Sequence, residues 1–306
     1  MSALAETYGA YEVSVPVVRT RYGDVRGFRE GDSFVWRSVP YAAPIAGPNR
    51  FRRPVAPRPW QGERDCTRFG AIAPQGLDAM VPMDSGLEIG EDCLWVNVWA
   101  PARPDKPRPV LVWLHGGAYC LGTAAQALYD GRRLAELGDM LVVGVNYRVG
   151  AFGFLDLSSL SRPGTVQFDS NLGLWDQVSA LEWIRDNIAE FGGDPDNVTL
   201  FGESSGAGCV TTLMTSPRAE GLFHRAIAQS PPATSVYGPN RAAGVARRYL
   251  ELAGVGRADA ADLCTLPLRR LVAAADMLVD EVPVKVPGTL ATAPVVDGDL
   301  VPDYPV

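Results

Sequence analysis

The stretch that decides the fold is VTLFGESSGAGC, residues 198–209. Its apolar run, 198–201, predicts a buried strand, and the residues that follow the glycines favour a helix. Between them, GESSG at 202–206 fits the G-x-S-x-G pattern of a nucleophile elbow, where a serine stands on a sharp strand-to-helix turn. The flanking glycines are needed because strand and helix nearly touch there. The pattern therefore predicts Ser204 as an acyl-transfer nucleophile at a helix N-terminus, where free N–H groups favour negative charge.

A second glycine-rich turn follows another apolar strand, in VLVWLHGGAYCLG at residues 110–122. Acyl transfer builds negative charge on the carbonyl oxygen, and preorganised N–H groups lower that barrier. Gly116 opens the turn, and we expect Gly117 and Ala118 to provide two such donors. The third donor is expected to be Ser205, the residue after the nucleophile. The alternative is a turn that serves only chain geometry, and its pairing with the elbow disfavours that interpretation.

The chain offers few bases for a serine nucleophile, because its only histidines are His115 and His224. In α/β-hydrolases the triad runs in the order serine, acid, histidine. His224 follows Ser204 by only twenty positions, which leaves no room for an acid-bearing strand and loop. Either His224 acts in an unusual geometry, or the base lies on polypeptide that is absent from this chain. The spacing favours the second interpretation, and we expect a structural role for His115.

The composition is that of a globular enzyme. A chain of 306 residues can form one domain with a large core. The net charge of −7 argues against nucleic acid or an anionic membrane as a partner. The N-terminus lacks the basic and apolar regions of a secretory signal. Five widely spaced cysteines fit neither a disulfide framework nor a zinc site, so we expect reduced thiols in a cytoplasmic protein without metal or cofactor.

Alternating strand and helix patterns predict one α/β domain with a mixed central sheet. Short strands separated by Asp-Gly and Gly-Asp turns predict an N-terminal antiparallel meander at about 15–40. Further strands are expected at 94–99, 110–115, 140–146, 198–201, 225–229 and 294–296. Helices are expected at 130–137, at 171–190, where apolar residues recur three and four apart, and two or three times within 241–276.

Five longer segments carry a resemblance to a known family. They are EDCLWVNV at 91–98, NYRVGAFGF at 146–154, the whole of 171–207, FHRAIAQS at 223–230 and PVVDG at 294–298. Together with the elbow and the glycine turn, they resemble the type-B carboxylesterase/cholinesterase family of α/β-hydrolases. The resemblance extends over residues 15–305, and motifs of this length are very specific.

The resemblance implies an α/β-hydrolase fold with a mixed, mostly parallel central sheet. It gives Ser204 the role of nucleophile and assigns the same three N–H donors. It also implies that Ser230 hydrogen-bonds the catalytic acid, and that Glu91 and Arg148 form a structural ion pair. His224 falls on a position that is not catalytic in the family.

The chain departs from the family at its C-terminal end. It resembles the N-terminal three-fifths of the fold, and the family's acid and histidine follow the segment at 294–298. The acidic residues Asp297, Asp299 and Asp303 stand before the acid's position. We therefore expect residues 1–306 to be a single incomplete domain, truncated at its C-terminal part, without two members of the triad.

Two further departures concern a cysteine and a tryptophan. Cys93 matches a family cysteine that closes a loop by a disulfide in secreted members, and the partner position is Ala73 here. The loop 76–90 contains no tryptophan, whereas choline-binding members use one there. A choline substrate is therefore not expected.

The sequence thus predicts a serine carboxylic-ester hydrolase that forms an acyl-enzyme through Ser204 on a small-molecule ester. Its catalytic set would be completed by missing sequence or by a complementing chain, and the truncated sheet edge favours self-association. Two alternatives stay open, a non-catalytic binding or adhesion member of the same fold and an inactive degenerate fragment. The retention of Ser204 beside the glycine turn favours the enzyme.

Overall fold

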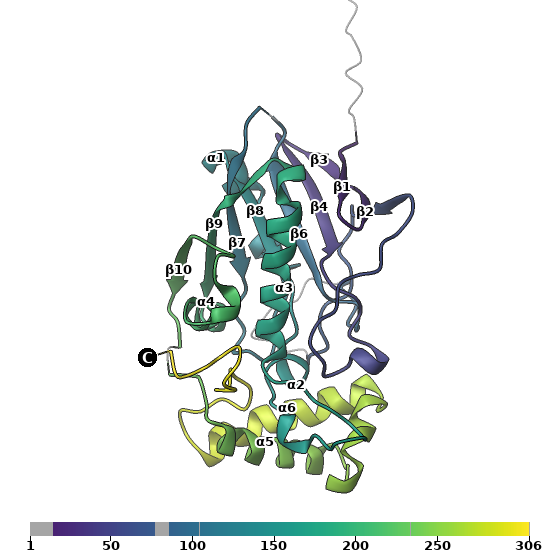
Figure 1. The fold of residues 1–306 in the computed structure, drawn as a ribbon, viewed down its shortest axis with the longest axis vertical. Coiled ribbons are helices and arrows are strands. Elements are labelled where there is room, and N and C mark those ends of the chain that lie inside the picture. The colour runs from purple at the N-terminus through teal and green to yellow at the C-terminus, as the bar shows by residue number, and fades with distance from the viewer. Residues whose placement is uncertain (1–14, 77–85, 104, 233, 306) are drawn as a thin grey trace, which may run out of the picture.

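The structure, a computed structural model, describes residues 15–76, 86–103, 105–232 and 234–305. Expectations that concern the first fourteen residues and most of the loop 76–90 lie outside these ranges. Within the described residues, a seven-stranded sheet forms the centre of the molecule, and helices cover its faces and one of its ends (Figure 1).

The central sheet has the strand order β10-β9-β7-β8-β6-β4-β3. Its strands are β3 (Phe28–Glu30), β4 (Ser33–Pro40), β6 (Trp95–Pro101), β7 (Arg108–Leu114), β8 (Leu141–Val145), β9 (Gly193–Glu203) and β10 (Arg225–Gln229). The half formed by β8, β7, β9 and β10 is parallel, whereas β6, β4 and β3 pair antiparallel. The expected mixed α/β sheet is confirmed. β8 is apolar and buried along its whole length, because both faces of this part of the sheet are covered.

The N-terminal strands divide between two sheets. β1 (Val17–Thr20) and β2 (Gly23–Arg26) form an antiparallel pair, and β2 also pairs with β5 (Glu63–Asp65) in a separate three-stranded sheet. β3 pairs with β4 in the central sheet instead. The expectation of one continuous meander is therefore wrong. The chain passes between the sheets at Gly27, where a side chain would come within 2.7 Å of Trp36.

The helices agree with the sequence pattern in position. They are α1 (Arg132–Gly138), α2 (Gly150–Gly153), α3 (Leu172–Asn187), α4 (Ser205–Met214), α5 (Pro239–Leu252) and α6 (Leu268–Lys285). Short 3-10 helices occur at Gly47–Asn49, Ala127–Tyr129, Ser158–Leu160, Ile188–Phe191, Pro217–Ala219 and Arg257–Cys264. Among the described residues, no helix has both the length and the apolar character needed to cross a membrane.

Two differences from the expected elements lie near the C-terminal end. The strand expected at 294–296 is reduced to one parallel bridge between Tyr237 and Val295. α6 continues past the expected end of its helical pattern to Lys285, with Pro283 inside its last turn. A proline lacks only its own N–H bond and distorts the preceding turn, so near a helix end it is tolerated.

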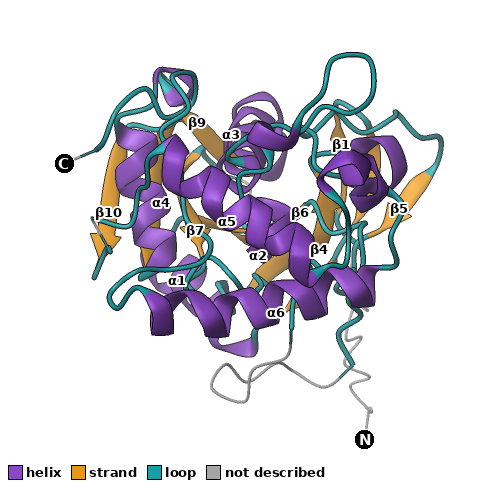
Figure 2. Ribbon diagram, turned by 90° about the horizontal axis from the view of Figure 1, so that it is seen from below, coloured by secondary structure: helices purple, strands orange, loops and turns teal. Residues whose placement is uncertain are grey.

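The layers around the sheet place the elbow at one end of the molecule. α3 packs along one face of the sheet and α1 covers part of the other, where Ala135 contacts Trp99 and Val142. α5 and α6 form a layer beyond the C-terminal ends of β7 and β9 (Figure 1), which Figure 2 shows from below. The loops that follow these strands therefore lie between the sheet and the α5–α6 layer.

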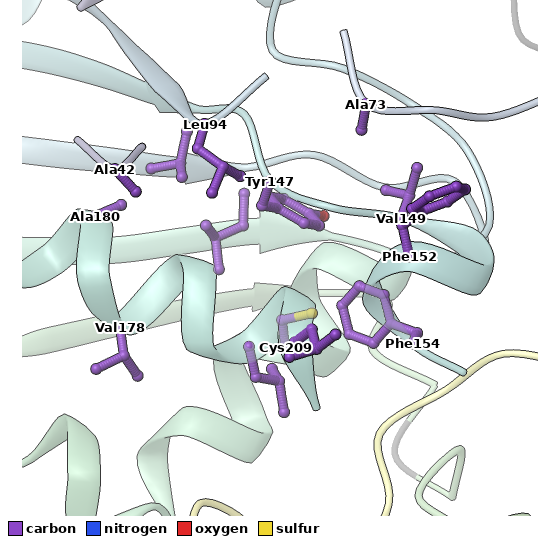
Figure 3. Packing of buried hydrophobic residues seen from close by; sticks show 14 of the residues in the cluster. Ala42, Ala73, Leu94, Tyr147, Val149, Phe152, Phe154, Val178, Ala180 and Cys209 are labelled. Atoms are coloured by element: carbon purple, nitrogen blue, oxygen red, sulfur yellow. The ribbon is translucent and has the colours of Figure 1, made fainter. Parts of the chain in front are cut away.

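The main core joins the sheet, α3 and the elbow helix α4. Tyr147 and Phe154 have ring centroids 6.3 Å apart, and Cys209 of α4 points into the same cluster (Figure 3). On α3, the residues expected to face the core, Leu174, Val178, Leu181 and Ile184, are all at most 2% exposed. The core thus fixes α4, and with it the start of the helix that follows Ser204.

The buried ion pairs differ from those implied by the resemblance. Arg148 pairs with Asp176 of α3, and both side chains are fully buried. Glu91 pairs instead with Arg50, through two hydrogen bonds of 2.6 and 2.8 Å. The implied Glu91–Arg148 pair is therefore wrong, because α3 presents a closer carboxylate to Arg148.

The disulfide position is also unpaired, since Cys93 is a buried free thiol.

Candidate active site

Ser204 lies at the turn between β9 and α4, in a backbone conformation that is rare outside glycine. Its φ is 53° and its ψ is −125°. Such conformations cost about 1–3 kcal/mol and persist only where the surrounding structure enforces them. Here Gly202 and Gly206, which flank the serine, allow β9 and α4 to approach each other closely. A methyl group on Gly202 would lie 2.6 Å from Gly206 C, and one on Gly206 would lie 2.5 Å from His115 O.

Backbone hydrogen bonds hold the serine in this turn. Ser204 N donates to Gln229 O of β10 at 2.9 Å, and Gly208 N donates to Ser204 O at 2.9 Å. Ser205 is the first residue of α4, so its N–H has no acceptor within the helix. The elbow therefore leaves the N–H group of Ser205, the residue after Ser204, without an acceptor in α4.

The glycine loop, residues 116–122, follows β7 and lies directly against the elbow. β7 and β9 are parallel neighbours with Leu114 opposite Gly202, so the chain leaves both strands at the same edge of the sheet. A methyl group on Gly116 would come within 3.2 Å of Ser204 Cβ. The two motifs that the sequence separates by about eighty residues are thus in contact.

The glycine loop is held in a strained conformation. Gly117 and Gly122 have φ values of 128° and 110°, and Ala118 and Tyr119 have φ values of 52° and 61°. Cys120 N and Leu121 N donate to Gly117 O, which closes the loop on itself. Within the described part of the chain, the N–H groups of Gly117 and Ala118 meet no acceptor. These are the two donors expected from the sequence.

His115 is buried under the glycine loop and does not face Ser204 as a base. Its Nδ1 donates to Gly116 O at 2.9 Å, its ring stacks on Tyr147 at 4.3 Å, and Tyr147 Oη donates to His115 O at 2.5 Å. Burial lowers the pKa of His115 from 6.5 to about 4, and the hydrogen bond to Gly116 opposes this only partly. The imidazole is therefore neutral at neutral pH.

Because the buried imidazole of His115 is neutral, we expect the free energy of unfolding to decrease in acid. Because its folded-state pKa lies below its unfolded value, unfolding takes up a proton below pH 6.5, and the stabilisation is lost as the pH falls towards 4. We expect His115 to account for about 2–3 kcal/mol of the decrease in unfolding free energy between neutral pH and pH 4. Urea titrations of wild type and His115→Asn measure this. If the unfolding free energy of His115→Asn fell as steeply with decreasing pH as that of the wild type, this expectation would be contradicted.

His224 lies directly before β10, beside the middle of β9 and six residues before the nucleophile along that strand. Val198 N donates to His224 Nδ1 at 3.1 Å, and His224 N donates to Val198 O at 2.8 Å. Val198 precedes Ser204 by six residues in an extended strand, which corresponds to roughly 20 Å. The interpretation in which His224 acts as the base is therefore wrong for this structure.

Ser230 lies beside the elbow, directly after β10, with a φ of 52°. Ser230 is exposed, and its hydroxyl meets no acidic side chain of the described residues. The acids near the C-terminal end are occupied elsewhere. Asp297 accepts hydrogen bonds from Asn171 and from backbone N–H groups, and Asp299 pairs with Arg53 and Arg218. Neither Asp297 nor Asp299 therefore reaches Ser204.

A cavity of about 310 Å³ opens beside the glycine loop. Cys120 and Leu121 of the loop form one wall, and Val272 and Asp276 of α6 form another. α6 carries no motif, so no pattern in the sequence indicates that this helix borders the site. Gln75, which also lines the cavity, was likewise not singled out, although its side chain bonds the loop.

Comparison with known proteins places the chain in a family. The family model described as the carboxylesterase family matches residues 14–306. The para-nitrobenzyl esterase of Bacillus subtilis (strain 168) is 43% identical over 263 residues, which are 86% of this chain and 53% of that protein. The acetylcholinesterase of Gallus gallus is 40% identical, over 95% of this chain and 40% of that protein.

Solved structures show the same fold. A PNB esterase superposes with a TM-score of 0.86 at 40% identity, over 95% of this chain and 60% of that one. A Geobacillus stearothermophilus carboxylesterase superposes with a TM-score of 0.83 at 41% identity, over 94% of this chain and 57% of that one. The chain thus spans about half the length of the curated relatives it matches. By its sequence and its α/β-hydrolase fold, the chain belongs to the carboxylesterase family.

Proposed function

We propose that this chain carries the nucleophile and the oxyanion hole of a serine carboxylic-ester hydrolase that forms an acyl-enzyme through Ser204. One observation carries the proposal. The strained Ser204 lies in contact with a loop whose N–H groups at Gly117 and Ala118 meet no acceptor among the described residues. Strain and unsatisfied donors are both costly in a fold, and both are useful when a tetrahedral intermediate must be bound.

In the proposed reaction, Ser204 Oγ bonds to the acyl carbon of the ester, and the carbonyl electron pair moves to the oxygen. The N–H groups of Gly117, Ala118 and Ser205 bind that oxyanion, and Gly116 leaves room for it. The hydroxyl proton passes to a base. Collapse of the intermediate breaks the bond to the alcohol, which takes a proton and leaves, and water then releases the acid from acyl-Ser204. Each oxyanion donor contributes about 3–4 kcal/mol where such donors have been removed.

The base and the catalytic acid are proposed to lie on polypeptide outside residues 1–306. Neither histidine reaches Ser204, as described above. We propose that residues 1–306 form one incomplete domain and that Ser230, exposed beside the elbow, meets the acid of the completing segment.

The completing segment is proposed to pair with β10, either as a complementing chain or through self-association. β10 is the terminal strand of the sheet in the described residues, and Ile227 on it is 46% exposed. An open strand edge is a template for a further strand.

We also propose a cytoplasmic location. Cys66, Cys93, Cys209 and Cys264 are free thiols, which persist in reducing compartments. Burial raises the pKa of Cys66 to about 12, so this thiol stays protonated and unreactive at neutral pH.

If Ser204 lacks a base in this chain, an added base such as imidazole is expected to restore part of its esterase activity. Residues 1–306 are expected to hydrolyse a short p-nitrophenyl ester slowly, because a serine without a base is a weak nucleophile. Added imidazole is expected to raise the rate about tenfold or more above the same reaction with Ser204→Ala, which corrects for direct hydrolysis by imidazole. Equal rates for wild type and Ser204→Ala at every imidazole concentration would exclude the proposed nucleophile and favour a non-catalytic member of the fold. A fast wild type without imidazole would show a base within the chain.

A further inference from the structure

The glycine loop needs external support to keep its shape. Ala118 and Tyr119 both have positive φ values, which favour glycine, and Gly117 and Gly122 lie in the same region. Hydrogen bonds within the loop close only its centre, through Gly117 O. The preceding residue, His115, bonds Gly116 O at the N-terminal end, and a side chain from another part of the chain holds the C-terminal end.

Gln75 holds the C-terminal end of the loop with both atoms of its amide. Gln75 Oε1 accepts from Gly122 N at 2.7 Å, and Gln75 Nε2 donates to Gly122 O at 2.9 Å. Nε2 also donates to Ala73 O at 3.0 Å, which fixes the side chain to its own segment. The side chain is only 4% exposed. A buried amide that bonds both polar groups of one residue leaves that residue a single position.

The two hydrogen bonds from Gln75 fix Gly122, and Gly122 in turn packs against the peptide that carries the Gly117 N–H. A methyl group on Gly122 would lie 2.5 Å from Gly116 O and 2.6 Å from His115 Nδ1, so Gly122 packs directly against the bond between these two groups. Gly116 O and the N–H of Gly117 belong to one planar trans peptide and point in opposite directions. Whatever holds Gly116 O in place therefore also aims the Gly117 N–H.

We infer that Gln75 is a positioning residue of the oxyanion hole: its amide holds Gly122 against the Gly116 carbonyl and thereby directs the Gly117 and Ala118 N–H groups at Ser204. The inference rests on the proposed function, since it assigns a purpose to that same site. It also connects the segment before residue 77 to catalysis.

Two substitutions separate the hydrogen bonds from the packing. Gln75→Met keeps the size of the side chain and removes both bonds. Gln75→Glu keeps the acceptor for Gly122 N, but the ionised carboxylate repels Gly122 O and Ala73 O; when protonated, it donates again. Gln177→Met removes an equally buried amide on α3, outside the loop, and serves as the matched control.

The first readout is the rate at which a fluorophosphonate modifies Ser204, whose phosphoryl oxygen would occupy the oxyanion hole. We expect a decrease of about 10- to 100-fold in Gln75→Met, as for a small misplacement of a catalytic group, and no such decrease in Gln177→Met. In Gln75→Glu, the rate relative to wild type is expected to recover as the pH falls from about 9 to about 6 and the carboxylate takes up a proton. A merely structural role predicts no recovery of this kind.

The second readout is the amide NMR resonances of Gly117 and Ala118, which report loop geometry whether or not Ser204 reacts. We expect them to shift or split in Gln75→Met and to stay unchanged in Gln177→Met. Unchanged resonances in both Gln75 variants would overturn the inference, and so would shifted resonances with unchanged Ser204 labelling. A wild type that is not labelled at Ser204 would count against the proposed function alone, because the resonances would still decide the role of Gln75. If Gln75→Met does not fold, Gln75→Glu at low pH carries the comparison.

Discussion

Replacing Ser204 with alanine is expected to abolish covalent modification of the chain by fluorophosphonates. The reagent needs a nucleophile whose attack places the phosphoryl oxygen among N–H donors, and Ser204 is the serine whose Cβ lies against Gly116 of the glycine loop. The loss should exceed about 1,000-fold, since removal of the nucleophile from a serine hydrolase lowers kcat by about 10⁶-fold. Intact-mass spectrometry of wild type and variant over time measures the modified fraction.

The matched control is Thr211→Val. Thr211 lies on the same helix, and its hydroxyl donates a hydrogen bond to Gly208 O. This variant should be modified at the wild-type rate, with the adduct on the peptide that contains Ser204. Adducts that form equally fast in Ser204→Ala, or on another residue of the wild type, would show that the elbow does not supply the nucleophile.

Removing the carboxylate of Asp176 is expected to cause the largest loss of stability. Arg148 and Asp176 are both fully buried, and Arg148 donates to Asp176 from N, Nε and Nη2 at 3.0, 2.7 and 2.6 Å. Asp176→Ala would leave a buried guanidinium without its counterion, which costs about 3–5 kcal/mol. A typical domain has about 5–15 kcal/mol in total. Urea unfolding of the purified variant should show this decrease in unfolding free energy.

An exposed ion pair provides the control for this loss. Asp186 pairs with Arg21 and Arg185 at the surface, so Asp186→Ala should cost at most about 1 kcal/mol. The double variant Arg148→Met/Asp176→Leu should be less destabilised than Asp176→Ala, because no charge is left unpaired. A loss below about 1 kcal/mol in Asp176→Ala would contradict the assignment of this pair as a buried, mutually dependent unit.

The parts of the site that the sequence predicts are those encoded locally. Glycines at 202 and 206 are required by the elbow itself, and the glycines after β7 are required by the positive φ values of the loop. Periodicity identified α3 for a similar reason, since the helix repeat is a property of neighbouring residues. Local chemistry thus sufficed to predict the strand-to-helix turn at 202–206 and the position of α3.

The parts that the sequence does not predict depend on partners far along the chain. Gln75 meets Gly122 across 47 residues, and no spacing rule relates a glutamine to a distant glycine. Arg148 was given the wrong partner because α3 brings Asp176 closer than Glu91, a consequence of packing. The short segment at 294–296 has the composition of a strand but finds only one bridging partner in the described residues.

The central claim is that the N–H groups of Gly117, Ala118 and Ser205 converge on the oxygen that develops negative charge when Ser204 attacks. A crystal structure of the chain after fluorophosphonate modification tests this directly, because the phosphoryl oxygen takes the place of the oxyanion. The account predicts an adduct on Ser204 Oγ with that oxygen about 2.7–3.1 Å from the three backbone nitrogens. An adduct whose phosphoryl oxygen faces solvent, or lies beyond hydrogen-bond distance of Gly117 N and Ala118 N, would contradict it.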